Sequence, residues 1–237
     1  MRHKYTKNMR IPSDDRVIWL EKTDSTSAWL RREQERLPSP VIVAVLEQTD
    51  GRGQGDHLWH SAPGQNLTFS ILLRYDDNHP FAAREQQLLT MSSSLAVCDF
   101  LEGEGIDGRI KRPNDIYAGG GKICGMLIEN SLHGPLMKSS IVGMGINVNE
   151  TFFPADLPCP VSMAGLSGRP YDIKKCLWDF LKHFFERLNQ IWDSPRTLRR
   201  EYDEKLLFQS AYCLCGVGGL EHGSAGNKDV GSTSGQQ

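Results

Sequence analysis

The chain has 237 residues, of which 39% are hydrophobic and 24% are charged, and its formal net charge is −2. This length is sufficient for one domain with a buried core, or for one domain with a small appendage. The composition excludes a wholly disordered chain and an integral membrane protein, and the near-neutral charge gives no indication of a nucleic-acid partner.

The first quarter of the chain predicts two strands, each followed by a polar or glycine-rich segment. Residues 16–22 are expected to form a short strand, and the polar residues after it suit a helix start with Ser25 and Thr26 at its N-terminus. Residues 41–48 are rich in β-branched side chains, which favours a buried strand. This strand ends in residues 51–55, where three glycines at alternate positions break any regular element.

The rest of the ordered sequence predicts a meander of strands between long helices. Residues 66–74 alternate as a strand does, and apolar residues at helical spacing predict a helix over residues 82–104. Residues 109–148 predict three or four antiparallel strands joined by tight turns, and helices are expected over 171–192 and 196–207. Because strands and helices do not alternate strictly, the predicted class is α+β, a mixed, largely antiparallel sheet with helices packed mainly on one side.

The last part of the chain has a different composition. Residues 208–237 are rich in glycine and serine and have almost no apolar periodicity, so we expect a mobile tail and a fold that ends near Leu207. Residues 1–16 are expected to be an N-terminal extension, and no apolar stretch follows their basic residues as a secretory signal requires. The predicted protein is cytoplasmic and has no membrane partner.

The cysteines and histidines of the sequence show no metal-ligand spacing. Six cysteines are present and none forms a C-x-x-C pair, so we expect reduced thiols and assign no metal site. Cys213 and Cys215, which are one residue apart, are interpreted as incidental.

Two common nucleotide-binding motifs are excluded. The sequence around Lys122 resembles the end of a P-loop, but Ile123 stands where Ser or Thr is required and Ile116 stands where the first glycine is required. The glycine runs at residues 51–56 and 143–148 each lack the third glycine of the dinucleotide fingerprint. A nucleotide site in this chain would therefore be of another kind.

Three segments combine glycine or charge with predicted strands, and each has an ordinary alternative. Residues 51–55 could hold an anion with backbone N–H groups and the fork of Arg52, or form a plain loop. Residues 111–115 and Lys122 place charge among buried strands, which marks either a site or a solvated hairpin. Residues 143–147 fit a β-bulge, which is favoured when this segment is taken alone, or a close approach of a ligand to the backbone. Trp59 taken alone fits ordinary core packing.

Taken together and in register, these segments resemble the biotin–protein ligase family. The resemblance covers about residues 17–207 and implies a catalytic domain whose sheet is related to class II aminoacyl-tRNA synthetases and lipoate ligases. The segments that carry it are Asp24-Ser25-Thr26-Ser27, Glu47-Gln48-Thr49-Asp50-Gly51-Arg52-Gly53, Trp59, Lys111-Arg112-Pro113-Asn114-Asp115, Lys122-Ile123-Cys124-Gly125 and Gly143-Met144-Gly145-Ile146-Asn147.

The resemblance also implies a reaction and a set of site residues. ATP would adenylate biotin, and the biotinyl group would pass to a lysine on the biotin carboxyl carrier domain of a carboxylase. Lys122 and Arg52 are the expected catalytic residues, with Mg²⁺ on the triphosphate and Asp115 as one candidate contact. The residues expected to bind biotin are Ser25, Thr26, Ser27, Gln48, Arg52, Gly53, Gln54, Trp59, Lys122 and Gly125, and those expected to bind ATP or the adenylate are Gly51, Arg52, Gly53, Lys111, Asn114, Asp115, Lys122 and Asn147.

The sequence departs from the family in three places. Many relatives carry further basic residues after Gly-Arg-Gly, whereas residues 54–57 here are Gln, Gly, Asp and His, so phosphate is expected to be held more weakly. About 16 residues precede the first predicted strand, which is too few for a winged-helix DNA-binding domain, and no repressor role is expected. The tail at 208–237 stands in place of the family's small C-terminal β-barrel.

Other functions remain open at this point. Lipoate or octanoate transfer uses the same fold and the same adenylation chemistry, although the polar set Ser25, Thr26 and Gln48 favours a ureido ring over an acyl chain. A non-catalytic biotin-binding or regulatory module is the other alternative, which the presence of Lys122 and Arg52 disfavours. The sequence does not decide whether the protein forms a homodimer.

Overall fold

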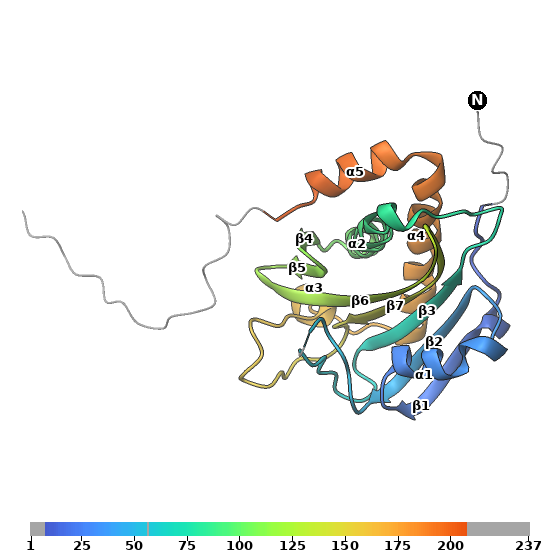
Figure 1. Cartoon of the computed structure of the whole chain (residues 1–237). Coiled ribbons are helices and arrows are strands. Elements are labelled where there is room, and N and C mark those ends of the chain that lie inside the picture. The colour runs from blue at the N-terminus through green and yellow to red at the C-terminus, as the bar shows by residue number, and fades with distance from the viewer. Residues whose placement is uncertain (1–7, 56, 208–237) are drawn as a thin grey trace, which may run out of the picture.

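Seven strands form one sheet, in the order β1-β2-β3-β7-β6-β5-β4 (Figure 1). The structure is a computed structural model that describes residues 8–55 and 57–207. The predicted tail at 208–237, with Cys213 and Cys215, lies outside the described residues. The strands are β1 (Val17–Thr23), β2 (Val41–Gln48), β3 (Leu67–Arg74), β4 (Arg109–Lys111), β5 (Asp115–Ala118), β6 (Gly121–His133) and β7 (Leu136–Ile146).

The pairing of these strands confirms the predicted mixed, largely antiparallel sheet. Among the named pairs, only β1 and β2 are parallel. All other neighbouring strands in the order given above are antiparallel. The segment predicted to contain three or four strands forms four, from β4 to β7. Gly134 has a positive φ of 58° at the β6–β7 turn, a conformation that glycine adopts without a steric cost.

The helices cover the sheet unequally, as the sequence predicted. Figure 1 shows α2, α4 and α5 on one side of the sheet and α1 on the other. The larger core is packed around aromatic rings of β3, α2 and α4 such as Phe69, Phe100 and Phe180, and a smaller cluster around Leu30 lies beneath α1. The helices are α1 (Thr26–Glu33), α2 (Gln87–Gly103), α3 (Met163–Ser167), α4 (Ile173–Asp193) and α5 (Pro195–Glu204).

The helix predicted over residues 82–104 begins later than expected. Ala82 forms a bridge with Leu136, and the N–H of Ala83 donates to the carbonyl of Pro135 at 2.9 Å, so this segment is held against the β6–β7 hairpin. A short 3-10 helix, Ala83–Glu85, then leads into α2. Pairing with a strand more than fifty positions away therefore overrides the local helical pattern.

The helix predicted over residues 196–207 ends earlier, at Glu204, because the chain then joins the edge of the sheet. The N–H of Ile110 on β4 donates to the carbonyl of Lys205 at 2.9 Å, and the N–H of Leu207 donates to the carbonyl of Ile110 at 2.8 Å. Helix α3 was not predicted; Ser162 caps its start and Gly168 ends it with a φ of 73°. Among residues 8–55 and 57–207, no helix combines the length and the apolar character that crossing a membrane requires.

Candidate functional site

A cleft of about 310 Å³ opens where the start of α1, the loop after β2 and the β4–β5 turn meet the first half of β6 and the end of β7. Its volume lies at the lower end of the range for small-molecule sites, about 300–1,000 Å³. All of the predicted site residues except Gly51 and Asn147 line it. Those that do are Ser25, Thr26, Ser27, Gln48, Arg52, Gly53, Gln54, Trp59, Lys111, Asn114, Asp115, Lys122 and Gly125.

Backbone hydrogen bonds bring the glycine loop to the start of α1. The N–H of Thr49 donates to the carbonyl of Thr23 at 3.0 Å, and the N–H of Asp50 donates to the carbonyl of Asp24 at 2.8 Å. These bonds continue the parallel pairing of β1 and β2 past the ends of both strands. Residues 23–27 and 48–53 therefore meet in space because the two strands end at the same edge of the sheet.

One end of the cleft is a buried hydroxyl cluster at the N-terminus of α1. The hydroxyls of Thr26 and Ser27 lie 2.7 and 2.9 Å from Oγ of Ser70 on β3, and all three residues are buried. The N–H of Thr26 donates to Oε1 of Gln48 at 3.0 Å, and the N-cap Ser25 accepts from the N–H of Ala28. Because these groups are tied to one another, their polar atoms are held at fixed positions.

A wall of glycines faces the ring of Trp59 beside this cluster. A Cβ on Gly145 would lie 2.1 Å from Cε2 of Trp59, and one on Gly143 would lie 2.5 Å from Oγ of Ser27. β7 pairs regularly with β3 and β6 at both glycines, so the bulge favoured for this segment is wrong. The glycines leave room for the indole and the hydroxyl cluster, as a ligand-facing wall requires.

Trp59 lies in the cleft wall and not in the general hydrophobic core. Its N–H donates to the carbonyl of Gly51 at 2.9 Å, and a Cβ on Gly51 would lie 2.3 Å from the carbonyl oxygen of Trp59. Gly51 therefore allows the two backbones to approach, although it does not itself line the cleft. The indole N–H of Trp59 is buried and has no hydrogen-bond partner among the described residues. A ligand acceptor in the cleft could satisfy it.

The other end of the cleft carries the predicted lysine. Nζ of Lys122 lies 2.7 Å from Oδ1 of Asp115, and the two side chains are 29% and 22% exposed. The same ammonium lies 5.8 Å from the centre of the Trp59 ring, and Cε of Lys122 lies 3.3 Å from where a Cβ on Gly125 would be. Lys122 is thus a partly buried group held beside Trp59, unlike a solvated hairpin lysine.

Asn147 and Asn114 support this lysine-bearing hairpin. Nδ2 of Asn147 donates to the carbonyls of Lys122 at 3.3 Å and Val161 at 3.0 Å, so this buried amide fastens the backbone of Lys122 from outside the cleft. The N–H of Met126 donates to the carbonyl of Asn114 at 3.1 Å, and the amide of Asn114 donates back to the carbonyl of Met126. Both asparagines therefore fix β6 relative to its neighbours.

Arg52 projects from the glycine loop toward solvent. Its side chain is 54% exposed, and Nη2 lies 3.5 Å from Oδ2 of Asp50, which is equally exposed. An exposed ion pair of this kind contributes at most about 1 kcal/mol. The guanidinium can therefore exchange Asp50 for an anionic ligand at little cost.

A buried carboxylate anchors the segment that follows Trp59. Glu150 accepts hydrogen bonds from the N–H of Ala62 at 3.2 Å and from the amide of Asn66, and it lies 3.2 Å from Nε2 of His60. His60 therefore has a structural partner. Across the described part of the chain, no group of three or more His, Cys, Asp or Glu side chains lies close enough together to hold a metal ion.

The cysteines of the described residues form no disulfide. Burial raises the pKa of the Cys98 thiol to about 12 and that of Cys176 to about 11, so both stay protonated at neutral pH and are poor nucleophiles.

Several residues in the cleft were not among the predicted site residues. Gly143, Met144, Gly145, Arg112 and Pro113 belong to motifs that the sequence had singled out, so a signal for them existed. The others lie in strands or just after the glycine loop, and the sequence did not predict them as site residues: His57, Leu58, Thr68, Met126 and Leu127.

Comparison with known proteins places these features in a family context. Residues 19–147 match the Biotin/lipoate A/B protein ligase family. A biotin–[acetyl-CoA-carboxylase] ligase of Paracoccus denitrificans is 32% identical over 176 residues, which are 71% of this chain and 70% of that protein. The bifunctional ligase/repressor BirA of Bacillus spizizenii is 31% identical over 172 residues, 66% of this chain. The matched region spans about half, 52%, of the Bacillus protein.

Solved structures show the same fold. The biotin protein ligase of Aquifex aeolicus in complex with biotin and ATP has a TM-score of 0.66 and 28% identity, and the match covers 81% of this chain and 78% of that one. The biotin protein ligase of Leishmania major has a TM-score of 0.68 over 89% of this chain and 87% of that one, at 20% identity. The second similarity concerns the fold alone.

Proposed function

The chain belongs to the biotin/lipoate A/B protein ligase family, and from this premise we propose that it is an ATP-dependent biotin–protein ligase. In this proposal, residues 17–207 adenylate biotin to biotinyl-5'-AMP. The biotinyl group then passes to a lysine on the biotin carboxyl carrier domain of a biotin-dependent carboxylase in the cytoplasm. The relatives with printed ligase names and the Aquifex complex with biotin and ATP support this assignment.

One observation carries the proposal: the cleft has a polar end and a cationic end with Trp59 between them. The contacts give the order of these groups along the cleft. Ser27 lies beside Gly143, and Trp59 lies beside Gly145 on the same strand. Trp59 also lies beside Gly125 and near Lys122. A ureido ring offers one strong acceptor and two N–H donors, which suits hydroxyls and an amide held in place. The carboxylate at the other end of biotin would then reach Lys122.

The first chemical step joins two anions, and the cationic end of the cleft suits that task. A biotin carboxylate oxygen attacks the α-phosphorus of ATP, a P–O bond forms, and pyrophosphate leaves with the electron pair of the bond that breaks. Lys122 and Arg52 would offset the repulsion and stabilise charge on the transition-state oxygens, at about 3 kcal/mol for each well-placed donor.

Mg²⁺ fits this cleft as an ion held chiefly by the phosphates of ATP. Asp115 is the one carboxylate among the described cleft residues, and it is already paired with Lys122 at 2.7 Å. Magnesium commonly binds through one or two carboxylates together with substrate phosphates and water. It would supply charge neutralisation on the leaving pyrophosphate.

In the second step the neutral amine of a carrier lysine attacks the carbonyl carbon of the mixed anhydride. The C–N bond forms, AMP leaves, and the amine proton passes to solvent or to the departing phosphate. Positioning accounts for most of the rate enhancement in such a transfer, because the adenylate is already activated. The fixed hydroxyl cluster and Trp59 would supply that positioning.

ATP–pyrophosphate exchange measured in parallel with biotin, lipoate and octanoate tests the proposal. We expect exchange that requires both biotin and Mg²⁺, because the polar end of the cleft matches a ureido ring better than an acyl chain. Exchange driven by lipoate or octanoate and not by biotin would reassign the substrate within the family. Biotin binding without any exchange would instead identify a non-catalytic module.

Replacing Gln48 by alanine should weaken biotin binding by about tenfold or more. The side chain accepts from the N–H of Thr26 at 3.0 Å, and its removal leaves this buried residue without that partner, at a cost of about 1–3 kcal/mol. The dissociation constant of biotin, measured by calorimetry, gives the result directly.

Two further variants make this measurement specific. Gln48→Glu keeps an oxygen for Thr26 but loses the amide N–H, so wild-type affinity in that variant would restrict the role of Gln48 to holding α1. Gln87→Ala, at an exposed position at the start of α2, is the matched control and should bind biotin normally. Unchanged affinity in Gln48→Ala would remove this residue from the biotin site.

A further inference from the structure

Positive charge is concentrated in the cleft although the whole chain has a net charge of −2. Among the described residues that line the cleft, Arg52, Lys111, Arg112 and Lys122 are cationic and Asp115 is anionic. Cationic side chains gathered in a concave surface raise the local concentration of anions. Of these four, Arg112 alone has been given no role, since Lys111 was already expected to bind ATP or the adenylate.

Arg112 lies at the outer rim of this cleft, in the β4–β5 turn. Its side chain is 64% exposed, whereas Lys122 at the inner end is 29% exposed. Because both residues line the same cleft and Arg112 is the more exposed, we expect a polyanion whose first phosphate lies at Lys122 to run outward toward the guanidinium of Arg112. Phosphate oxygens match the planar, bidentate fork of arginine better than they match a lysine.

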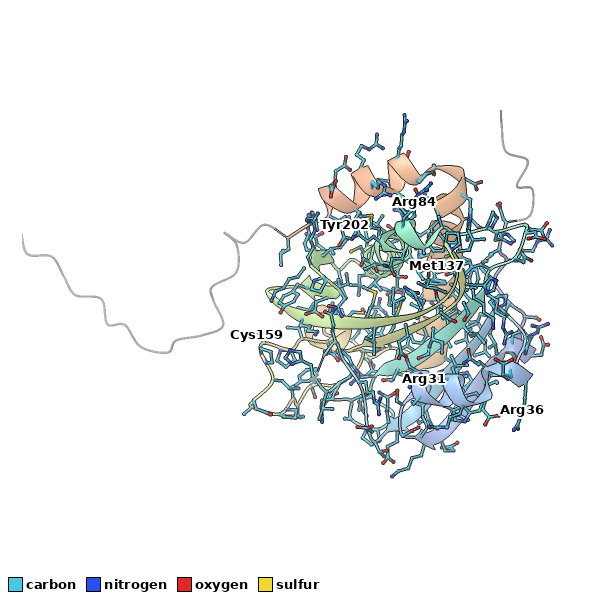
Figure 2. The ribbon with its side chains drawn as sticks, in the orientation of Figure 1. Arg31, Arg36, Arg84, Met137, Cys159 and Tyr202 are labelled. Carbon is cyan, nitrogen blue, oxygen red and sulfur yellow. The ribbon has the colours of Figure 1, made fainter. Side chains whose placement is uncertain are left out.

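Arg112 is held in place by the end of α5. Nη2 of Arg112 lies 3.4 Å from Oδ1 of Asp203, and its guanidinium carbon lies 6.0 Å from the centre of the Tyr202 ring. Figure 2 labels Tyr202 on α5, on the side of the molecule where β4 and β5 lie. The tyrosine is buried, so its ring is a fixed apolar surface beside the guanidinium.

The two contacts of Arg112 differ in how easily they are exchanged. The Asp203 carboxylate is 64% exposed, and an ion pair between exposed groups contributes little because water competes for both charges. A side-chain hydrogen bond with the buried Tyr202 occupies only part of the five N–H donors of the guanidinium, so donors remain for a phosphate. Arg112 can thus exchange Asp203 for a phosphate while Tyr202 keeps it at the rim.

We propose that Arg112 binds the β- and γ-phosphates of ATP, and that Asp203 holds its guanidinium at the rim until the nucleotide arrives. This inference rests on the proposed function for the identity of the nucleotide. It gives the chain a second arginine for the polyphosphate besides Arg52, on a different segment of the cleft lining, the β4–β5 turn. The basic residues missing from positions 54–57 of the glycine loop are compensated in this way.

The test measures the binding of inorganic tripolyphosphate and of AMP to the full chain by calorimetry at fixed ionic strength. Arg112→Gln should weaken tripolyphosphate by about tenfold, because a charge-assisted hydrogen bond is lost, and should change AMP by less than about twofold. Asp203→Asn should tighten tripolyphosphate by at most about fivefold, because it removes only the exchanged partner.

Arg109→Gln is the matched control. Arg109 lies on β4, just before the turn that carries Arg112, and is paired with Asp107 at 3.0 Å. It does not line the cleft, so tripolyphosphate affinity should be unchanged. Unaltered tripolyphosphate affinity in Arg112→Gln would overturn the inference. An equal loss of AMP affinity would also overturn it, since Arg112 would then contact the adenosine or the α-phosphate.

The inference and the proposed function fail separately. Binding of tripolyphosphate requires no turnover, so its dependence on Arg112 is measured whether or not the chain exchanges pyrophosphate with biotin. If the wild-type chain shows no biotin-dependent exchange, the ligase proposal is rejected. If it shows normal exchange and Arg112→Gln leaves the KM for ATP unchanged, only the role of Arg112 is rejected.

Discussion

Replacing Lys122 by methionine should lower the rate of biotin adenylation by about 10²–10³-fold while leaving the dissociation constant of biotin within about threefold. Methionine keeps the length of the side chain but removes the charge that would face both reacting anions. It also leaves the Asp115 carboxylate, now 2.7 Å from an ammonium, without its partner in the cleft. Single-turnover formation of biotinyl-5'-AMP and calorimetry with biotin measure the two quantities.

Two variants distinguish the effect of losing the Lys122 ammonium from the effect of leaving the Asp115 carboxylate unpaired. Adding Asp115→Asn to Lys122→Met removes the uncompensated negative charge and should recover about tenfold of the rate. Lys138→Met, at an exposed position of β7 away from the cleft, should adenylate biotin at the wild-type rate. Normal turnover in Lys122→Met would show that this lysine is only a hairpin residue.

Replacing Gly145 by alanine should weaken biotin binding by about a hundredfold. The new Cβ would lie 2.1 Å from Cε2 and 2.3 Å from Nε1 of Trp59, so the indole must leave its place in the cleft wall. Overpacking of this kind costs about 1–3 kcal/mol or more, and here the displaced ring also enters the space for the ligand. Calorimetry with biotin and the melting temperature report the two effects.

A second substitution distinguishes this clash from general destabilisation. Gly145→Ala combined with Trp59→Ala removes the clash, so the melting temperature should recover while biotin affinity stays low. Gly103→Ala is the control, because a Cβ there meets nothing within 4 Å and alanine is favoured in the last turn of a helix. Wild-type biotin affinity in Gly145→Ala would mean that Trp59 is not a wall of the biotin site.

The elements that the sequence predicted well are those whose pattern is local. The strand expected over 41–48 matches β2, because a run of β-branched residues needs only its own chemistry to favour an extended buried segment. The tight turns expected among residues 109–148 likewise fall at short glycine signals, Gly119–Gly120 and Gly134, which have positive φ. The start of α2 was not predicted, since it depends on the pairing of Ala82 with Leu136.

The same distinction holds for the cleft. Its glycines and charged residues were visible because they interrupt apolar strands, and a conflict of that kind marks a site. The regular pairing of Gly143 and Gly145, and the Trp59 ring that lies beside Gly145, depend on distant residues that no local pattern reports. Ser70 was missed because one hydroxyl in the apolar strand β3 gains its meaning only from the hydroxyls of Thr26 and Ser27 across the sheet.

The hydroxyl cluster limits how many protons the cleft can offer to a ligand. Ser70 has one proton, so it can donate to Thr26 or to Ser27 but not to both, and the other hydroxyl must donate to Ser70. At most one of the two cleft hydroxyls is then left to donate toward a ligand, while the other presents only lone pairs. The two arrangements interconvert by rotation of hydroxyl protons alone, so choosing one costs about 0.4 kcal/mol, the RT ln 2 of two equivalent states. A ligand with an acceptor and a donor side by side fixes this choice, whereas a ligand with two adjacent acceptors would leave one of them facing a lone pair.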